Sequence, residues 1–189
     1  MLRNSPLRGF QLPGAARKLV ASLFADDTST FLAATDKWSA VWTVINQWCA
    51  GSRAKFNAGK TEVIPVGTPE YRSAVATHRS ISGEAGNEED KIPGSIHIAA
   101  QGEAVRILGA WIGNGVDQVA VWTPALKKIN EFLKRWGRCH PSMGGKTSIV
   151  QMGPGGISQY LTTVQGMPKS VEKEIELAVR KFLWGDRNP

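Results

Sequence analysis

The chain has 189 residues, of which 42% are hydrophobic, so its composition excludes an intrinsically disordered protein and allows one ordinary domain or one core with a smaller satellite. Its net charge of +7 makes polyanions candidate partners. Two cysteines exclude a disulfide framework, and no signal-peptide core or long apolar window occurs, so we expect an intracellular protein, nuclear or cytoplasmic, that is neither secreted nor membrane-bound.

The first predicted elements are two short strands. Residues 18–25 and 28–34 are rich in strand formers, and Asp26 and Asp27 stand between them. This arrangement predicts a hairpin with both aspartates at its turn.

A helix and a third strand are expected next. Thr35 and Asp36 can cap a helix in which apolar residues recur every three or four positions until Gly51. Residues 57–60 then favour a turn and residues 61–66 a strand.

The middle of the chain is rich in Gly and Pro. We interpret residues 68–102 as a surface insertion with one helix, over 69–79. Residues 95–99 and 104–112 are expected to form strands flanking a turn at 101–102.

The last third is expected to be helical. Thr123-Pro124 has the pattern of an N-cap followed by a first-turn proline, which predicts a helix start with four inward-facing apolar residues: Leu126, Ile129, Leu133 and Trp136. A second helical stretch over 142–165 should be kinked or broken by the Gly and Pro residues of 153–156. A last helix is predicted over 168–184.

The positive charge is concentrated in the helical last third of the chain and at its N-terminus. Residues 123–189 carry eleven basic and five acidic residues, and residues 1–18 carry four basic residues and no acid. A basic face laid along an anionic partner explains this distribution, and an ordinary solvated helix surface is the alternative.

The Asp26-Asp27 pair is the candidate catalytic feature. Two adjacent carboxylates repel each other, and the nearest basic residues are Lys18 and Lys37. A divalent cation would relieve this repulsion, because Mg²⁺ is commonly held by one or two carboxylates together with substrate phosphates. A solvated turn is the plainer alternative for an Asp-Asp pair.

Three short motifs stand at residues 24–28, 57–62 and 107–113. Together they resemble the reverse transcriptases of LINE-type (non-LTR) retrotransposons, particularly fungal ones. Phe24-Ala25-Asp26-Asp27-Thr28 looks like the aromatic-Ala-Asp-Asp hairpin of that family. Residues 57–62, Asn-Ala-Gly-Lys-Thr-Glu, are similar to its Asn-x-x-Lys-Thr-Glu element. Residues 107–113, Ile-Leu-Gly-Ala-Trp-Ile-Gly, are similar to its primer-grip turn.

Further likeness lies in the helical region, at Gly144-Gly145-Lys146, Gln159-Tyr160-Leu161, Met167-Pro168 and Phe182-Leu183-Trp184. The resemblance covers roughly residues 7–185. It implies an α+β fold, in which a truncated, partial polymerase palm (a split βαβ sheet with the Asp-Asp hairpin) over 1–122 precedes an all-α thumb over 123–189.

The resemblance also implies an activity and its partners. The activity is nucleotidyl transfer from a dNTP to a primer 3′-OH on an RNA or DNA template, with two Mg²⁺ or Mn²⁺ ions. The implied partners are a duplex of RNA template and DNA primer, the dNTP, and the missing upstream palm and fingers or a complementing copy.

Residue roles follow from the same resemblance. Asp26 and Asp27 would bind metal, and Lys60 would lie near the incoming triphosphate as a further catalytic residue. Phe24, Asn57, Gly109 and Gly113 would contact nucleotide or primer. The thumb would bind the nucleic-acid backbone through five residues: Lys127, Lys128, Lys134, Arg135 and Arg138.

One expected feature is missing. The family has another metal-binding aspartate on a strand well upstream of the hairpin, whereas no Asp or Glu precedes Asp26 in this sequence. Asp36 does not replace it, because it opens the following helix. We therefore expect the chain to be catalytically incomplete by itself. The alternative is a non-catalytic nucleic-acid-binding module left from a decayed element.

Overall fold

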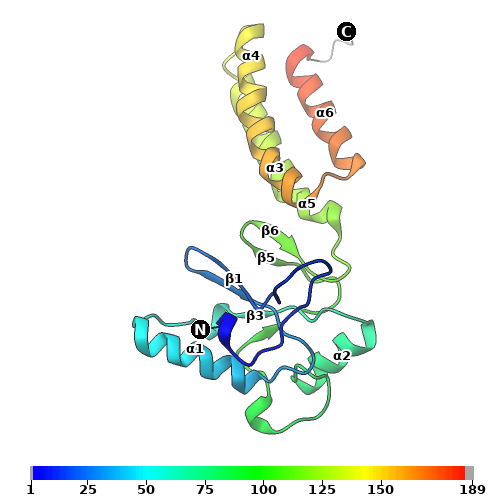
Figure 1. Cartoon of the computed structure of the whole chain (residues 1–189). Coiled ribbons are helices and arrows are strands. Elements are labelled where there is room, and N and C mark those ends of the chain that lie inside the picture. The colour runs from blue at the N-terminus through cyan, green and yellow to red at the C-terminus, as the bar shows by residue number, and fades with distance from the viewer. Residues whose placement is uncertain (1, 186–189) are drawn as a thin grey trace. The chain divides into compact units, whose positions relative to one another are not determined.

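The computed structural model describes residues 2–185 and divides the chain into two compact units, Met1–Val105 and Arg106–Pro189 (Figure 1). About 50% of the chain is helical and 12% is in strands, so the protein is α+β, as its sequence predicts. No helix in the described part of the chain combines the length and the apolar character needed to cross a membrane.

The first unit contains most of the short strands. Its elements in chain order are η1 (Leu2–Asn4), β1 (Ala21–Phe24), β2 (Asp27–Thr30), α1 (Trp38–Ser52), η2 (Ala58–Lys60), β3 (Glu62–Val63), α2 (Pro69–His78), η3 (Glu88–Asp90) and β4 (His97–Ile98). β1 pairs with β2 in antiparallel orientation, and β3 pairs with β4 in parallel orientation. The strands of the chain pair only two by two, so a continuous palm sheet is not seen among residues 2–185.

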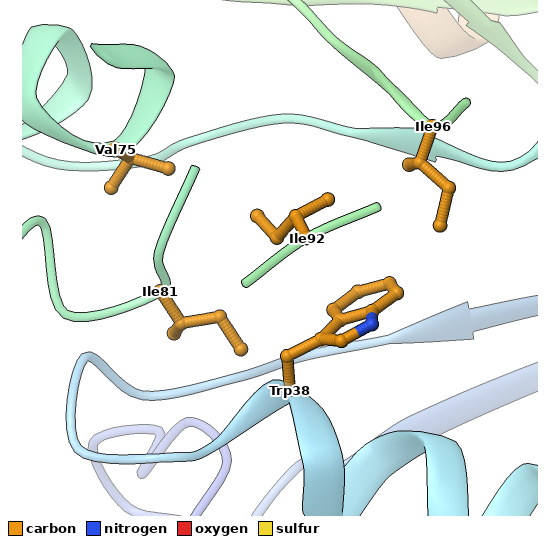
Figure 2. Close-up of a cluster of buried hydrophobic side chains, with 5 residues drawn as sticks. All are labelled: Trp38, Val75, Ile81, Ile92 and Ile96. Carbon is orange, nitrogen blue, oxygen red and sulfur yellow. The ribbon is translucent and has the colours of Figure 1, made fainter. Parts of the chain in front are cut away.

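The core of the first unit is built around Trp38 at the start of α1. Figure 2 shows its indole together with Val75 of α2 and with Ile81, Ile92 and Ile96. Four of these five buried residues belong to the segment 68–102. This segment therefore forms core rather than lying on the surface as an insertion. The sequence pattern misses this because the three isoleucines are isolated between polar, Gly and Pro residues and show no periodicity.

A second cluster joins the N-terminal segment to α1. Leu7, Val20 and Val41 are each 1% exposed and pack together. The apolar stripe of α1 is buried only over its first turn, at Trp38 and Val41, whereas Trp48 near its end is 44% exposed. The sequence correctly predicts the helix but not how little of its apolar face is covered.

Asp36 does not cap α1, contrary to the expectation from its position. Lys37 is the N-cap residue and makes no side-chain capping bond. The carboxylate of Asp36 instead accepts three backbone N–H bonds, from Arg8 (2.6 Å), Gly9 (3.0 Å) and Ala33 (2.8 Å). It is 9% exposed, so it satisfies donors that would otherwise be buried without partners.

The second unit is a helical bundle with one small strand pair at its start. β5 (Val105–Ile107) begins at the unit boundary and pairs with β6 (Ala110–Ile112). The helical elements that follow are α3 (Gln118–Gly137), α4 (Met143–Val150), the π-helical turn η4 (Gln151–Gly155), α5 (Gly156–Gln165) and α6 (Lys169–Trp184). α3 packs against α4, α5 and α6, and α4 also contacts α6 (Figure 1). Trp122, Leu126 and Val171 form one buried cluster, and Ile129, Leu133 and Ile149 form another.

The start of α3 differs from the sequence prediction. Asp117 caps the helix by accepting N–H bonds from Val119 (2.9 Å) and Ala120 (3.2 Å), so Pro124 lies inside the helix. An interior proline costs about 3 kcal/mol. The added turn places Trp122 in the core at 0% exposure, and burying a tryptophan contributes roughly 4–6 kcal/mol. Burial of Trp122 therefore outweighs the proline penalty.

The interruption expected at 153–156 takes the form of the π-helical turn η4. The helix continues through Pro154 because π-type geometry accommodates the missing N–H. Gly153 in this turn lies directly against the ring of Phe132 on α3, where a Cβ would come within 2.2 Å of two ring atoms.

Candidate functional site

The hairpin carrying the Asp pair forms as predicted. Phe24 pairs with Asp27 at the end of the β1–β2 register, so Ala25 and Asp26 make a two-residue turn. Ala25 has a φ of 53°, a left-handed conformation at the first turn residue. Asp26 therefore lies in the turn itself and Asp27 is the first residue of β2.

The hairpin tip is open to solvent. Both carboxylates are exposed, and the side chains of Leu23 and Phe24 are each 65% exposed. Within residues 2–185, neither aspartate forms an ion pair or accepts a side-chain hydrogen bond. Two apolar side chains and two unpaired carboxylates thus occupy one exposed tip, free to contact a ligand or another chain segment.

The carboxylates suit a hard divalent cation only in part. Their oxygen atoms are the ligand type that Mg²⁺ and Mn²⁺ prefer. The part of the chain that the structure describes contains no group of three His, Cys, Asp or Glu side chains that could hold a metal ion. The described residues therefore do not complete a metal site by themselves.

The Asn57–Lys60 turn is a second exposed feature of the same unit. Asn57 Oδ1 accepts the N–H of Gly59 at 3.0 Å, and the Thr61 hydroxyl donates to the Asn57 carbonyl at 3.0 Å. Asn57 braces the turn, which is also what a plain turn-forming asparagine does. Lys60 ends η2 with an exposed side chain that has no ion pair among the described residues.

The strand predicted over 104–112 is folded into the β5–β6 pair. Leu108 and Gly109 form its turn, with φ values of 48° and 86°. Tyr160 of α5 lies over this turn: its ring would be 3.0 Å from a Cβ at Gly109, and its hydroxyl donates to the Leu108 carbonyl. Gly113 follows directly after β6.

Gln165 at the end of α5 fixes the same strand pair. Its Oε1 accepts the N–H of Trp111 at 2.9 Å and its Nε2 donates to the Trp111 carbonyl at 2.8 Å. Nε2 also donates to Gln118 Oε1 at 2.9 Å. Gln165 thus bonds the edge of β6 as a neighbouring strand would. The sequence analysis did not identify this role, because nothing local relates positions 54 residues apart.

The exposed side of α3 is basic. Lys127 and Lys134 lie seven residues apart, and Arg138 follows four residues later as the C-cap of the helix. Lys128 and Arg135 form a parallel row. All five are exposed, while Leu126, Ile129 and Leu133 on the opposite side are buried. None of the five forms an ion pair with any residue that the structure describes. We call these five residues the basic face of α3.

Trp136 does not point inward as the sequence predicts. It is 40% exposed and packs at the edge of the core against Phe132, with ring centroids 6.2 Å apart. Phe132, which the pattern of the sequence did not single out, is partly buried against the cluster of Ile129, Leu133 and Ile149.

Two short motifs of the helical region meet in the fold. Lys146 Nζ donates to the Leu183 carbonyl at 2.7 Å and lies 5.8 Å from the centre of the Phe182 ring. A cation at this position interacts favourably with the negative, C-terminal end of the α6 dipole. Lys146 is therefore a structural residue that ties α4 to the last turn of α6.

No family model, curated protein or solved structure matches the chain.

Proposed function

We propose that the chain is the palm and thumb portion of a LINE-type reverse transcriptase, and that its helical unit binds the duplex of RNA template and DNA primer. The single observation that carries this proposal is the basic face of α3. Five exposed cations without ion pairs stand opposite a buried apolar stripe on one helix. One acidic residue, Glu131, stands among these five cations, and this excess of unpaired, aligned cations suits a row of phosphates better than a solvated surface, where charges of both signs alternate.

The geometry of this face suits a nucleic-acid backbone. Lys127 and Arg138 are eleven residues apart, about three helical turns or roughly 16 Å. That length spans several successive phosphates of one strand, because the phosphates of a strand are spaced at about 3.4 Å of axis. Phosphate contacts fix position on a duplex without reading its sequence, so the binding should have little sequence preference.

In this proposal the first unit supplies part of the polymerase site. Asp26 and Asp27 would supply two carboxylates of a divalent-metal site that a carboxylate from another segment would have to complete, and the chemistry supplied there would be charge stabilisation for nucleotidyl transfer. The exposed Phe24 ring would border the primer end, and Lys60 would pair with the triphosphate of the dNTP. Asn57 holds the Lys60 turn in shape. In the second unit, Gly109 and Gly113 would each allow close approach of a primer backbone.

The binding part is tested by salt dependence. We expect affinity for a template–primer duplex to fall steeply with salt, with a slope of about −0.9 per neutralised phosphate. The double variant Lys127→Glu and Lys134→Glu should weaken binding and flatten this slope. Lys169→Glu with Lys173→Glu, an equal charge change on α6, is the matched control. An unchanged slope in the variant of Lys127 and Lys134 would mean that the basic face does not contact phosphates and contributes only to solubility.

A non-catalytic nucleic-acid-binding module is the second candidate. The observation in its favour is the exposed pair of carboxylates without a third acidic or His partner in residues 2–185. Primer extension with Mg²⁺ or Mn²⁺, a template–primer and dNTPs tests whether residues 1–189 catalyse synthesis without another segment. We expect no synthesis by residues 1–189 alone. Template-dependent extension that is lost in Asp26→Asn would show instead that these residues complete the site.

A further inference from the structure

One acidic residue lies in the middle of the basic face of α3. Glu131 is exposed, and the residues three and four positions away on both sides are all cations: Lys127, Lys128, Lys134 and Arg135. These positions are its nearest neighbours on a helix surface, about 5–6 Å away between Cβ atoms. Four cations therefore surround one carboxylate.

The Glu131 carboxylate is not paired with the cations around it. Glu131 forms no ion pair in the part of the chain that the structure describes, although an i,i+4 pair forms elsewhere in the same unit, between Glu176 and Arg180. A carboxylate has only acceptor atoms and cannot face a phosphate. If the surrounding cations bind phosphates, Glu131 must face the sugars and base edges that lie between two rows of phosphates.

The basic face offers two rows of cations with Glu131 between them. Lys127 and Lys134 form one row, and Lys128 and Arg135 the other, each about two helical turns long. Two phosphate rows border the groove of a duplex, so such rows place Glu131 over the sugar and base edges of that groove.

The chemistry of the groove then decides which duplex fits. In a DNA minor groove the base edges present acceptors, with the amino group of guanine as the one donor, and these acceptors repel a carboxylate. An RNA strand adds 2′-hydroxyl groups, which donate hydrogen bonds, along a wide and shallow minor groove. We propose that Glu131 is a specificity-determining residue that makes the basic face of α3 prefer a duplex in which one strand carries 2′-hydroxyl groups.

This inference rests on the proposed function, and it is tested by comparing two ligands. Dissociation constants are measured by fluorescence anisotropy for an RNA–DNA hybrid and a DNA duplex of the same sequence, at one salt concentration. We expect the unmodified chain to prefer the hybrid by about tenfold, the order of one hydrogen bond to a charged group. Glu131→Gln should bring the ratio to about one, because the amide of Gln donates to the DNA acceptors.

Glu174→Gln on α6 is the matched control. It makes the same change in charge, but the residues three and four positions from Glu174 are uncharged: Ser170, Val171, Leu177 and Ala178. Its hybrid-to-DNA ratio should equal that of the unmodified chain, and thermal unfolding of both variants should be the same within a few degrees, as is usual for surface changes.

Three outcomes would overturn the inference. If Glu131→Gln strengthened the binding of the hybrid and of the DNA duplex equally, Glu131 would act only through general electrostatic repulsion of nucleic acid. Weaker DNA binding by Glu131→Gln would show that the carboxylate contacts base amino groups. An unchanged ratio would show no role in selection. Each of these outcomes leaves the proposed function standing, whereas absence of salt-sensitive binding to either duplex by the unmodified chain overturns both.

Discussion

Gly153 in the π-helical turn lies against the ring of Phe132 on α3, at a separation that only glycine permits. A Cβ at position 153 would stand 2.2 Å from two ring carbons, far inside van der Waals contact. The ring is a flat, half-buried part of the core beside Ile129 and Leu133, so it has little room to move.

Gly153→Ala should therefore destabilise the helical unit. We expect a loss of about 1–3 kcal/mol in the free energy of unfolding, the typical cost of overpacking. Chemical denaturation followed by circular dichroism measures it. Gly156→Ala is the control, because a Cβ at Gly156 meets no atom within 4 Å and α5 should gain about 0.5–1 kcal/mol. Equal stability of the two variants would mean that the π-helical turn can shift away from α3.

Asp36→Ala should destabilise the first unit. The change leaves the N–H groups of Arg8, Gly9 and Ala33 without their acceptor, at a site that is 9% exposed. An unsatisfied buried donor costs about 1–3 kcal/mol, and water will reach some of the three, so we expect a loss of about 2–4 kcal/mol. Asp26→Ala removes an exposed carboxylate without such bonds and should change the free energy of unfolding by less than about 0.5 kcal/mol.

Acid should weaken the contact between Asp90 and α1. The hydroxyl of Ser39 donates to Asp90 at 2.5 Å, and Lys37 lies 3.4 Å away. The Ser39 hydrogen bond and then the charge of Lys37 lower the pKa of Asp90 below its ordinary value. The carboxyl binds protons more weakly when folded. Its stabilising effect is therefore complete above the unfolded pKa, about 3.9, and is lost as pH falls through the lower folded pKa.

NMR titration of the Asp90 side chain measures this pKa directly. Ser39→Ala should move it upward, towards the ordinary value, while Thr43→Ala on the same helix should leave it unchanged, since the Thr43 hydroxyl bonds only to its own helix. A pKa that does not respond to Ser39→Ala would contradict the assigned cause.

Gln165→Ala should release the β5–β6 pair from α5. The change removes both bonds to the backbone of Trp111, so the Trp111 amide should exchange its hydrogen faster, by about tenfold for each 1.4 kcal/mol lost. Hydrogen exchange by NMR reports it. Gln159→Ala replaces an exposed glutamine of the same helix, and equal exchange rates in both variants would argue against the anchor.

Elements whose determinants lie close together in the sequence could be predicted, and those that depend on distant residues could not. The Asp26–Asp27 hairpin, α1 and α6 could be predicted, because turn residues and apolar periodicity act within a few positions. Pro124 misled the prediction of the start of α3, because the gain from burying Trp122 is a tertiary effect. The core roles of Ile81, Ile92 and Ile96 depend on Trp38, more than 40 residues earlier, and no local pattern shows them.

The same limits apply to the candidate site. The basic face of α3 follows from helical spacing alone, and its five residues are exposed as the sequence predicts. The bonds of Gln165 to Trp111 and of Lys146 to Leu183 join distant positions, so only the fold reveals them.

The Trp38 cluster has a consequence for synthesis on the ribosome. Its partners Ile92 and Ile96 follow Trp38 by more than 50 residues, so the core of the first unit stays open until nearly all of that unit has been translated. During translation the indole of Trp38 is therefore exposed for several seconds, at about 5–20 residues per second, and this interval is when a chaperone would bind the nascent chain.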